Sequence, residues 1–493
     1  TAIFERQGDW LRADLVVSVI GTVLVLEACR RVIGWIMTGI CLTAILYAMF
    51  GPYMPELIIH KGYSIERIAT TLWLTTEGIF GLPIGVAATF VFVFVLFGAF
   101  LETTGGGAFF IDLAYALTGR FSGGPAKTSV VASGFMGSVS GSAVGNVVAT
   151  GSFTIPMMIK AGFRPHVAGG IEPAASIGGM FMPPIMGAGG FIMAELTGLP
   201  YSQIMLVALF PALMYFFSVF VMVHYEAKRH NIVGEKSDKS AVEILRREWF
   251  YVLPLVVITI LMLLGYSPAY SAILGIVTCI LVSWFRRETR IDHKGFLQAA
   301  RAGAENSLKI GATAGVIGII IGVLTYSGLV LTFADIVIEL ADGRLFLTIL
   351  LIALASLVLG MGVPVTAAYL ITAVVAVPAL THLGINPIAA HMIVYWLSQD
   401  SNITPPVCIA AFAGATIAKA NMWKTAFSAF KFAKFLYLGP FLFGYVPAFS
   451  LDGSYRDIVI AFVLIVVGTW AYAWLLSGIW LDWFKKAAPA SRD

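Results

Sequence analysis

A short polar stretch, "DSNITPP" at residues 400–406, stands inside an otherwise apolar part of the chain. Its carboxylate, on Asp400, is followed by the hydroxyl and amide groups of Ser401, Asn402 and Thr404. Two adjacent prolines then remove backbone donors and leave carbonyl oxygens free. Oxygen ligands suit a hard cation, and a carboxylate can also take a proton. We therefore predict that Asp400 couples an ion, with a structural hydrogen bond to unwound backbone as the alternative.

Two other stretches, "GSVSGSAVGN" from Gly137 and "LGMGVPVTAA" from Leu359, combine small hydroxyls with glycine. Hydroxyls and freed carbonyls suit a monovalent cation, and half-helix N-termini offer N–H groups to an anion. Close helix packing is the alternative role of such small residues. The residues predicted to bind substrate are Ser138, Ser140, Gly141, Ser142, Pro183, Gly362, Thr366 and Pro405. Those predicted to couple a cation are Ser140, Asn146, Gly178, Gly360, Thr366, Asp400, Ser401, Asn402 and Thr404.

These polar stretches are exceptions in a chain whose composition suits lipid. Hydrophobic residues make up 59% of the 493 residues and charged residues only 12%, which is too apolar for an ordinary soluble protein. Runs such as those from Pro83 and Asp457 can cross roughly 30 Å of hydrocarbon as helices. We predict an all-α polytopic membrane protein with about 12 membrane segments. The net charge of +4 does not indicate nucleic acid as a partner, because membrane proteins collect Lys and Arg in cytoplasmic loops.

No arrangement of residues indicates an enzyme. The seven histidines are scattered, and neither a Ser, His and acid trio nor an HExxH run occurs. We predict no catalytic residue, no metal site and no cofactor, with Na+ as the one candidate ion if transport is sodium-coupled.

The double proline occurs twice, because Pro405 and Pro406 follow Pro183 and Pro184 by 222 residues. The same offset, without a gap, joins Pro156 to Pro378, Gly162 to Gly384, Pro165 to Pro387 and Ser176 to Ser398. Chance rarely aligns so many prolines, so the pattern predicts an internal duplication. Each copy contains a spanning helix, an apolar hairpin, a short turn and a helix interrupted by proline.

Loop charge predicts opposite orientations for the two copies. Two loops, beginning at Glu226 and Arg286, are rich in Lys and Arg and should face the cytoplasm. Counting spans outward places the turn at 160–164 inside the cell and the matching turn at 382–386 outside. Lys160 and Arg164 occupy the first turn, whereas the second has no Lys or Arg. This is the inverted arrangement of transporters that expose one central site alternately to each side.

Small-residue breaks interrupt both hairpins, at 127–158 and 349–380, at the same aligned place. We interpret each hairpin as a re-entrant pair of half-helices whose tip lies near the midplane, with an ordinary kinked helix as the alternative. The remaining charges are assigned peripheral roles: Glu172, Glu305 and Lys309 near span ends, and Glu102, Asp112, Glu195 and Asp335 at interfaces. Trp35, Trp423 and Trp483 are predicted to anchor the chain at the membrane interface.

Four stretches resemble the large membrane subunit of tripartite ATP-independent periplasmic (TRAP) transporters, particularly the TAXI type. They are "GSVSGSAVGNVVATGSFTIPMM" from Gly137, "AASIGGMFMPPIMGAGGFIMAE" from Ala174, "LGMGVPVTAAYLI" from Leu359 and "ITPPVCIAAFAGATIA" from Ile403. The resemblance extends over roughly residues 75 to 450. The second tip is similar to the TAXI pattern, because "GMGVPVTAAY" replaces the "GMFLE" type of the dicarboxylate and sialic-acid branches. Many relatives carry Asp where Asn146 stands, which leaves sodium and proton as alternative coupling ions.

The resemblance implies an elevator-type carrier of the ion transporter superfamily in the bacterial inner membrane. A TAXI-type periplasmic binding protein would deliver an organic acid, such as a C4 or C5 dicarboxylate, and a cation gradient would drive import. A small membrane subunit, fused or separate, would complete the assembly in the lipid bilayer. Residues 1–60 account for only part of this small subunit, which suggests either a truncated chain or a separately encoded subunit. A stand-alone cation/carboxylate carrier is the alternative, and a channel is a weaker one, because the sequence lacks a charged pore ring.

The predicted organisation has five parts. They are N-terminal helices at 1–80, as scaffold or small-subunit remnant; a first repeat at 81–226 with hairpin 127–158 and broken helix 165–194; basic loops and two linking helices at 227–300; a second repeat at 301–450 with hairpin 349–380 and broken helix 386–418; and a C-terminal helix with a cytoplasmic tail at 451–493.

Overall fold

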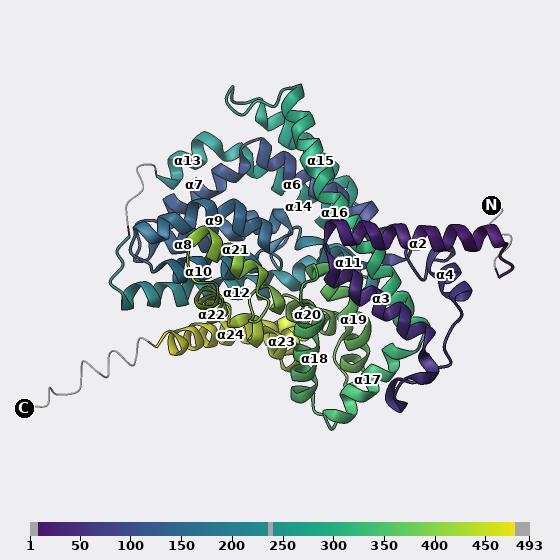
Figure 1. Cartoon of the computed structure of the whole chain (residues 1–493). Coiled ribbons are helices and arrows are strands. Elements are labelled where there is room, and N and C mark those ends of the chain that lie inside the picture. The colour runs from purple at the N-terminus through teal and green to yellow at the C-terminus, as the bar shows by residue number, and fades with distance from the viewer. Residues whose placement is uncertain (1–7, 235–239, 479–493) are drawn as a thin grey trace, which may run out of the picture.

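The computed structural model describes residues 8–234 and 240–478, and every regular element within those ranges is a helix (Figure 1). Six of the described helices are long and apolar enough to cross a membrane. They are Leu82–Thr103, Tyr201–Arg229, His293–Tyr326, Val365–His382, Met422–Tyr445 and Tyr455–Ser477. Five shorter apolar helices of 10–17 residues accompany them in the described part of the chain.

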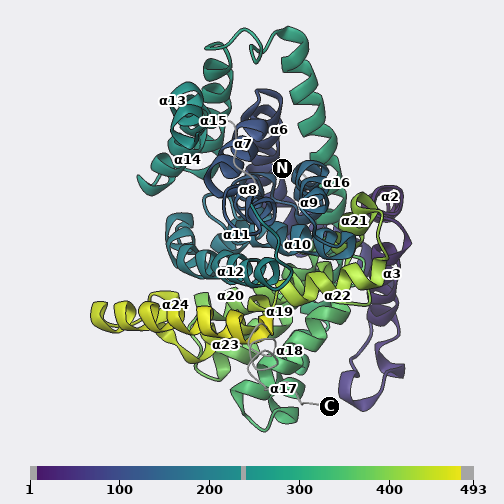
Figure 2. The same cartoon turned by 90° about the vertical axis from the view of Figure 1, so that its left-hand side faces the viewer.

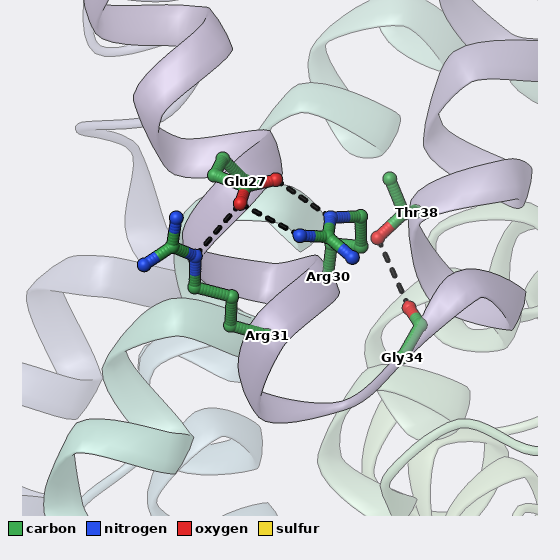
Figure 3. A network of polar contacts seen from close by, with 5 residues as sticks. All are labelled: Glu27, Arg30, Arg31, Gly34 and Thr38. Carbon is green, nitrogen blue, oxygen red and sulfur yellow. Dashed lines mark hydrogen bonds and ion pairs between the residues drawn. The ribbon is translucent and has the colours of Figure 1, made fainter.

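The N-terminal helices form a hairpin with a tight ionic turn. Helices α2 (Arg12–Val32) and α3 (Trp35–Met49) precede α4 (Ile65–Leu74). Figure 3 shows the α2–α3 turn, where the Glu27 carboxylate accepts bonds from Arg30 at 2.6 and 2.8 Å and from Arg31 at 2.7 Å. Arg30 and Arg31 lie in the last turn of α2, where their positive charges interact favourably with the negative end of the helix dipole.

The first half of the chain continues with α5 (Leu82–Val86), a π-helical turn (Ala87–Val91) and α6 (Phe92–Thr103). After α7 (Gly106–Thr118), the expected hairpin consists of α8 (Gly124–Ser140) and α9 (Ala143–Lys160). The expected broken helix consists of α10 (Pro165–Gly178) and α11 (Gly187–Thr197), and the long α12 (Tyr201–Arg229) follows.

The linking region contains α13 (Ala241–Glu248), α14 (Leu253–Leu263) and α15 (Pro268–Ser283). An ion pair of 2.8 Å between Arg286 and Glu248 joins the two basic loops. Asp292 begins the next helix by accepting the Gly295 N–H at 2.7 Å, and this hydrogen bond lowers the pKa of the Asp292 carboxyl.

The second half repeats the element order. It begins with α16 (His293–Tyr326), which starts ahead of the expected boundary at 301. The elements that follow are α17 (Leu329–Leu340), α18 (Leu345–Leu359), α19 (Val365–His382), α20 (Pro387–Leu397), the 3-10 turn η5 (Asp400–Asn402), α21 (Ile409–Ala418), α22 (Met422–Phe432) and α23 (Phe435–Tyr445). A last helix, α24 (Tyr455–Ser477), follows, while the predicted anchor Trp483 lies outside the described residues.

Backbone geometry also recurs at the 222-residue offset. The Pro183–Pro184 and Pro405–Pro406 bonds are both cis. Two residues after each pair, the chain takes a left-handed conformation, with φ of 56° at Met186 and 31° at Cys408. The same path therefore interrupts the helix in each half.

The two halves interlock at the centre of the molecule. In Figures 1 and 2 the helices α6–α10 lie above α17, α18 and α23, while α21 of the second half lies among the first-half helices, beside α9 and α10. At their junction, α9 and α10 pack against α21, and α10 also packs against α22. Small residues permit this approach, since a Cβ on Gly169 would lie 2.9 Å from the carbonyl oxygen of Gly414.

Candidate functional site

The first polar tip is the short connection between α8 and α9. Gly141 has a φ of +62°, and Ser142 caps α9 by accepting a hydrogen bond from the Gly145 N–H at 3.1 Å. Ser140 and Ser142 are exposed, whereas Ser138 is buried and donates to a backbone carbonyl at 2.8 Å. The hydroxyl of Ser140 makes only a long contact of 3.4 Å, so it is the tip hydroxyl least committed to local structure.

Asn146 lies in the first turn of α9, inside the first hairpin. The side chain is fully buried, and its Nδ2 donates to the carbonyl of Ser133 at 3.2 Å. Its Oδ1 has no hydrogen-bond partner among the described residues. A Cβ on Gly137 would lie 3.1 Å from Asn146 Nδ2 and 2.6 Å from the Cα of Gly179. The hairpin and the break therefore touch through glycine backbone.

Tyrosine hydroxyls donate hydrogen bonds to the carbonyl oxygens that the first break leaves without a helical partner. The Tyr201 hydroxyl lies 2.9 Å from the oxygen of Pro184 and 2.6 Å from that of Ile185. From the second half, the Tyr395 hydroxyl lies 2.8 Å from the oxygen of Met180 and 2.6 Å from that of Met186. These four oxygens, although freed by unwinding near Pro183, are thus already paired.

Gly178, the residue equivalent to Asp400, ends α10 in a tightly packed place. A Cβ there would lie 2.6 Å from the ring of Phe216 and 2.7 Å from that of Tyr215. The first break consequently has no room for a side chain where the second break has a carboxylate.

The second break retains unpaired polar atoms. Asp400 is only 3% exposed, and its Oδ1 has no hydrogen-bond partner in the described chain. The neighbouring Gln399 is fully buried, and both its Oε1 and its Nε2 also lack partners there. Buried polar atoms of this kind are costly unless a ligand, ion or water satisfies them. Asn402 adds one weak contact, in which its Nδ2 lies 3.5 Å from the Gln399 carbonyl.

The second hairpin brings further oxygens to the same place. A Cβ on Gly360 would lie 2.8 Å from the Ser401 Oγ and 2.9 Å from the carbonyl oxygen of Ser356. The buried Ser356 hydroxyl is likewise unpartnered among the described residues. Thr404 instead shares a hydrogen bond with the hydroxyl of Tyr437. Sequence reasoning missed Gln399 and Ser356, although one adjoins Asp400 and the other lies one helical turn before Gly360.

The second tip reaches the N-terminal helices. Gly362 has a φ of +74°, and a Cβ there would lie 2.7 Å from the side chain of Ile36 on α3. Ile36 comes two residues after Gly34, which ends the α2–α3 turn. Thr366 lies in the first turn of α19 and is half-buried, directly after Pro364 and Val365.

The structure thus places each predicted tip against the break of its own half. The first site is largely closed by tyrosines, whereas the second collects Asp400, Ser401 and Gly360 around unsatisfied oxygens. Chemically, this second group can hold a cation or a proton. The described residues contain no cluster of three or more His, Cys, Asp or Glu suited to a transition metal.

The expectation that Glu172 reaches water near a span end is wrong. Its side chain is fully buried within α10, and both carboxylate oxygens contact hydroxyl groups. Those hydroxyls belong to Ser129, Ser133, Thr150, Thr154 and Ser176. Glu305 and Lys309, by contrast, are exposed.

Two cavities border other predicted interface residues. One of about 410 Å³ includes Glu195, Tyr201 and Pro268 in its wall. The other, of about 220 Å³, lies between α6, α7 and α9, and its wall includes Glu102, Asp112 and Thr150.

Comparisons with known proteins agree with this architecture. Residues 20–449 match the family model "Tripartite ATP-independent periplasmic transporter, DctM component". A putative TRAP transporter large permease protein of Haemophilus influenzae is 26% identical over 64% of this chain and 74% of its own length. The C4-dicarboxylate TRAP transporter large permease protein DctM of Pseudomonas aeruginosa is 24% identical over 79% of this chain and 89% of its own.

A solved structure shares the fold. The Alcanivorax borkumensis YdaH transporter superimposes with a TM-score of 0.58 at 18% identity, covering 83% of this chain and 96% of that one. The family match spans most of the chain and so establishes the family. Its members are transporter components and not enzymes. The chain is a multi-pass membrane protein that belongs to the DctM family of tripartite ATP-independent periplasmic transporters.

Proposed function

We propose that this chain is the permease of a secondary transporter that imports an organic acid into a bacterial cell through the inner membrane. Membership of the DctM family supports this proposal, as does the name of the Pseudomonas aeruginosa relative, a C4-dicarboxylate permease. The observation that carries it is the pair of interrupted helices, each with a polar hairpin tip against its break. Such breaks within apolar helices are tolerated where they face a cavity or a ligand.

The coupling cation binds at the second break. Asp400 provides the charge, Ser401, Asn402 and Thr404 provide oxygens, and Gln399 and Ser356 join them through their unpaired buried atoms. A buried carboxylate needs a cation or a proton to offset its charge. Either Na+ or H+ offsets this charge, and uptake under separately imposed sodium and pH gradients distinguishes the two ions.

The substrate lies between the tips and the breaks. The tip hydroxyls of Ser140, Ser142 and Thr366 and the N-terminal ends of α9 and α19 offer hydrogen-bond donors to a carboxylate. Gly141 and Gly362 contribute backbone at the two tips, and Pro183 and Pro405 contribute backbone in the two breaks. A C4 or C5 dicarboxylate fits donors that approach from two sides.

Transport proceeds by an elevator movement of two inverted repeats. The mobile part comprises the hairpins α8–α9 and α18–α19 with the broken helices α10–α11 and α20–α21, which pack together at the centre. The scaffold comprises the N-terminal helices and α16, which lie along its flank (Figure 2). Opposite loop charge supports the inverted orientation of the two halves.

The partners are a TAXI-type periplasmic binding protein and a small membrane subunit, fused or separate. The second-tip sequence "GMGVPVTAAY" supports the TAXI type. The alternatives are a stand-alone carrier, which needs no binding protein, and a channel, which conducts faster than a transporter turns over.

Reconstituted uptake separates these functions. The full chain, with its small subunit where that is encoded separately, is placed in proteoliposomes with labelled dicarboxylate and with or without the purified binding protein. We expect uptake only with the binding protein present and only under an imposed sodium gradient or pH gradient. Uptake without binding protein would identify a stand-alone carrier, and conductance far above transporter turnover would identify a channel.

A further inference from the structure

Three helices of the first half converge on one buried carboxylate. Glu172 Oε2 contacts the Ser129 hydroxyl at 2.5 Å and that of Thr154. Glu172 Oε1 contacts the Ser133 hydroxyl at 2.7 Å, that of Ser176 at 3.3 Å and that of Thr150. Hydroxyls can donate to an ionised carboxylate and accept from a protonated one. This pocket therefore suits both protonation states of Glu172.

No basic side chain offsets this carboxylate in the described chain. On the helices packed against α10, Lys127 lies 3.0 Å from His224, and Glu226 lies 2.6 Å from Lys431. The other charged groups of these helices lie in first or last turns: Lys160 on α9, Lys228 and Arg229 on α12, and Lys424 on α22. His166 likewise lies in the first turn of α10, and α21 contains no charged residue. Tyr215 uses its hydroxyl on the Ala174 carbonyl at 2.6 Å.

The arrangement favours a proton over a metal cation. A bound cation would need ligand oxygens spaced around it, at 2.3 Å or more even for Ca²⁺. Here the hydroxyl oxygens instead contact the carboxylate oxygens directly. A single proton fits within such contacts without moving any heavy atom.

A cavity reaches the edge of this cluster. The 220 Å³ cavity has the exposed carboxylates of Glu102 and Asp112 in its wall, together with Thr150. Thr150 contacts both Glu172 and, through its hydroxyl at 2.7 Å, the carbonyl of Asn146. One threonine thus separates an acidic, exposed cavity from the buried carboxylate.

We propose that Glu172 is a proton-binding site that exchanges its proton with the cavity of Glu102 and Asp112 through the hydroxyl of Thr150. On exchange, the O–H bond of the Glu172 carboxyl breaks and the Thr150 hydroxyl oxygen accepts this proton, while the original Thr150 hydroxyl proton passes to a carboxylate of the cavity wall, Glu102 or Asp112. Glu172 is left ionised and the cavity carboxylate is protonated. The same threonine donates to the backbone carbonyl of Asn146 in the first hairpin, so a change in the charge of Glu172 alters the hydrogen bonds of that hairpin.

Infrared difference spectroscopy of the purified full chain in lipid, recorded between acid and alkaline pH, tests the site directly. We expect a carboxylic acid carbonyl band that disappears in Glu172→Gln, an isosteric and permanently neutral replacement. The matched control, Glu195→Gln, removes an exposed carboxylate from the other cavity and should keep the band. A Glu172→Gln spectrum identical to that of the wild type would overturn the proposal.

Ser129→Ala serves as a second variant if Glu172→Gln does not fold. It removes one donor to the ionised carboxylate and leaves the carboxyl group itself in place. We expect the carbonyl band to move to higher frequency, because the Glu172 carboxyl group loses one hydrogen bond. An unchanged band position would contradict the assignment. Neither measurement involves substrate or binding protein, so its outcome is independent of the proposed transport function.

Discussion

The hydroxyl of Tyr395, in the second half of the chain, lies 2.8 Å from the Met180 carbonyl oxygen and 2.6 Å from that of Met186, on either side of the first double proline. One O–H group therefore serves two carbonyls that the broken helix cannot pair internally. The contact makes the first break dependent on the second half, and any movement of these helices must carry Tyr395 with them.

Replacing Tyr395 with phenylalanine removes this contact and keeps the ring. Because both carbonyls are left without their donor in a buried place, we expect a loss of about 1–3 kcal/mol of stability. The measurement is the melting temperature of the purified protein in detergent. Tyr266→Phe, at an exposed ring, should melt like the wild type. A Tyr395→Phe protein that also melts like the wild type would show that the cross-half contact is dispensable.

The glycine contact between the first hairpin and the first break gives a second prediction. A methyl group on Gly137 would lie 2.6 Å from the Cα of Gly179, which is too close for backbone that cannot yield. We expect Gly137→Ala to cost about 1–3 kcal/mol through overpacking and to lower the melting temperature.

The control for this change is Gly311→Ala, since Gly311 is also helical and has no atom within 4 Å of an added Cβ. That variant should be as stable as the wild type or slightly more so, because alanine favours helix. Equal stability of the two variants would mean that the hairpin and the break are not held at this distance.

The positions of the breaks could be predicted from sequence because proline and glycine act locally. Each proline removes a backbone N–H donor, and glycine allows a positive φ. Both double prolines therefore lie where a helix is interrupted, as predicted. Tyr395 could not be found in this way. Its equivalent at the 222-residue offset is Pro173, and its role depends on packing between halves.

The place of Glu172 does not follow from its distance to a span end, because that distance carries no information about partners on other helices. Its partners come from three helices and meet only after folding. A signal was nevertheless present: Ser129 and Ser133, Thr150 and Thr154, and Glu172 and Ser176 are each four residues apart. Such spacing puts each pair on one helix face, and three polar faces in succession predict a shared buried cluster.

Asp400→Asn tests the proposed coupling site. The amide keeps the shape of the side chain but cannot carry the charge that holds a cation or a proton. We expect binding-protein-dependent accumulation under the imposed gradient to be lost, while exchange of labelled for unlabelled substrate at equal concentrations persists. Asp335→Asn, at an exposed carboxylate, should accumulate normally. Full accumulation by Asp400→Asn would exclude this residue from coupling.

The inverted orientation of the two halves predicts opposite accessibility for two equivalent turns. Lys160 and His382 are both exposed and are related by the repeat. The Arg286–Glu248 ion pair holds the two basic loops together, as expected if both face the cytoplasm, and span counting from those loops assigns Lys160 to the same side. A membrane-impermeant maleimide should therefore label Lys160→Cys in inside-out vesicles and His382→Cys in intact spheroplasts.

The native cysteines favour this assay, because Cys29, Cys41, Cys279 and Cys408 are all buried and should react slowly. Ser240→Cys, exposed at the start of α13 in the first basic loop, provides the cytoplasmic reference. If Lys160→Cys and His382→Cys were labelled from the same side, the halves would be parallel. The breaks at Pro183 and Pro405 could then not enter the membrane from opposite faces, and an alternating site between them would lose its structural basis.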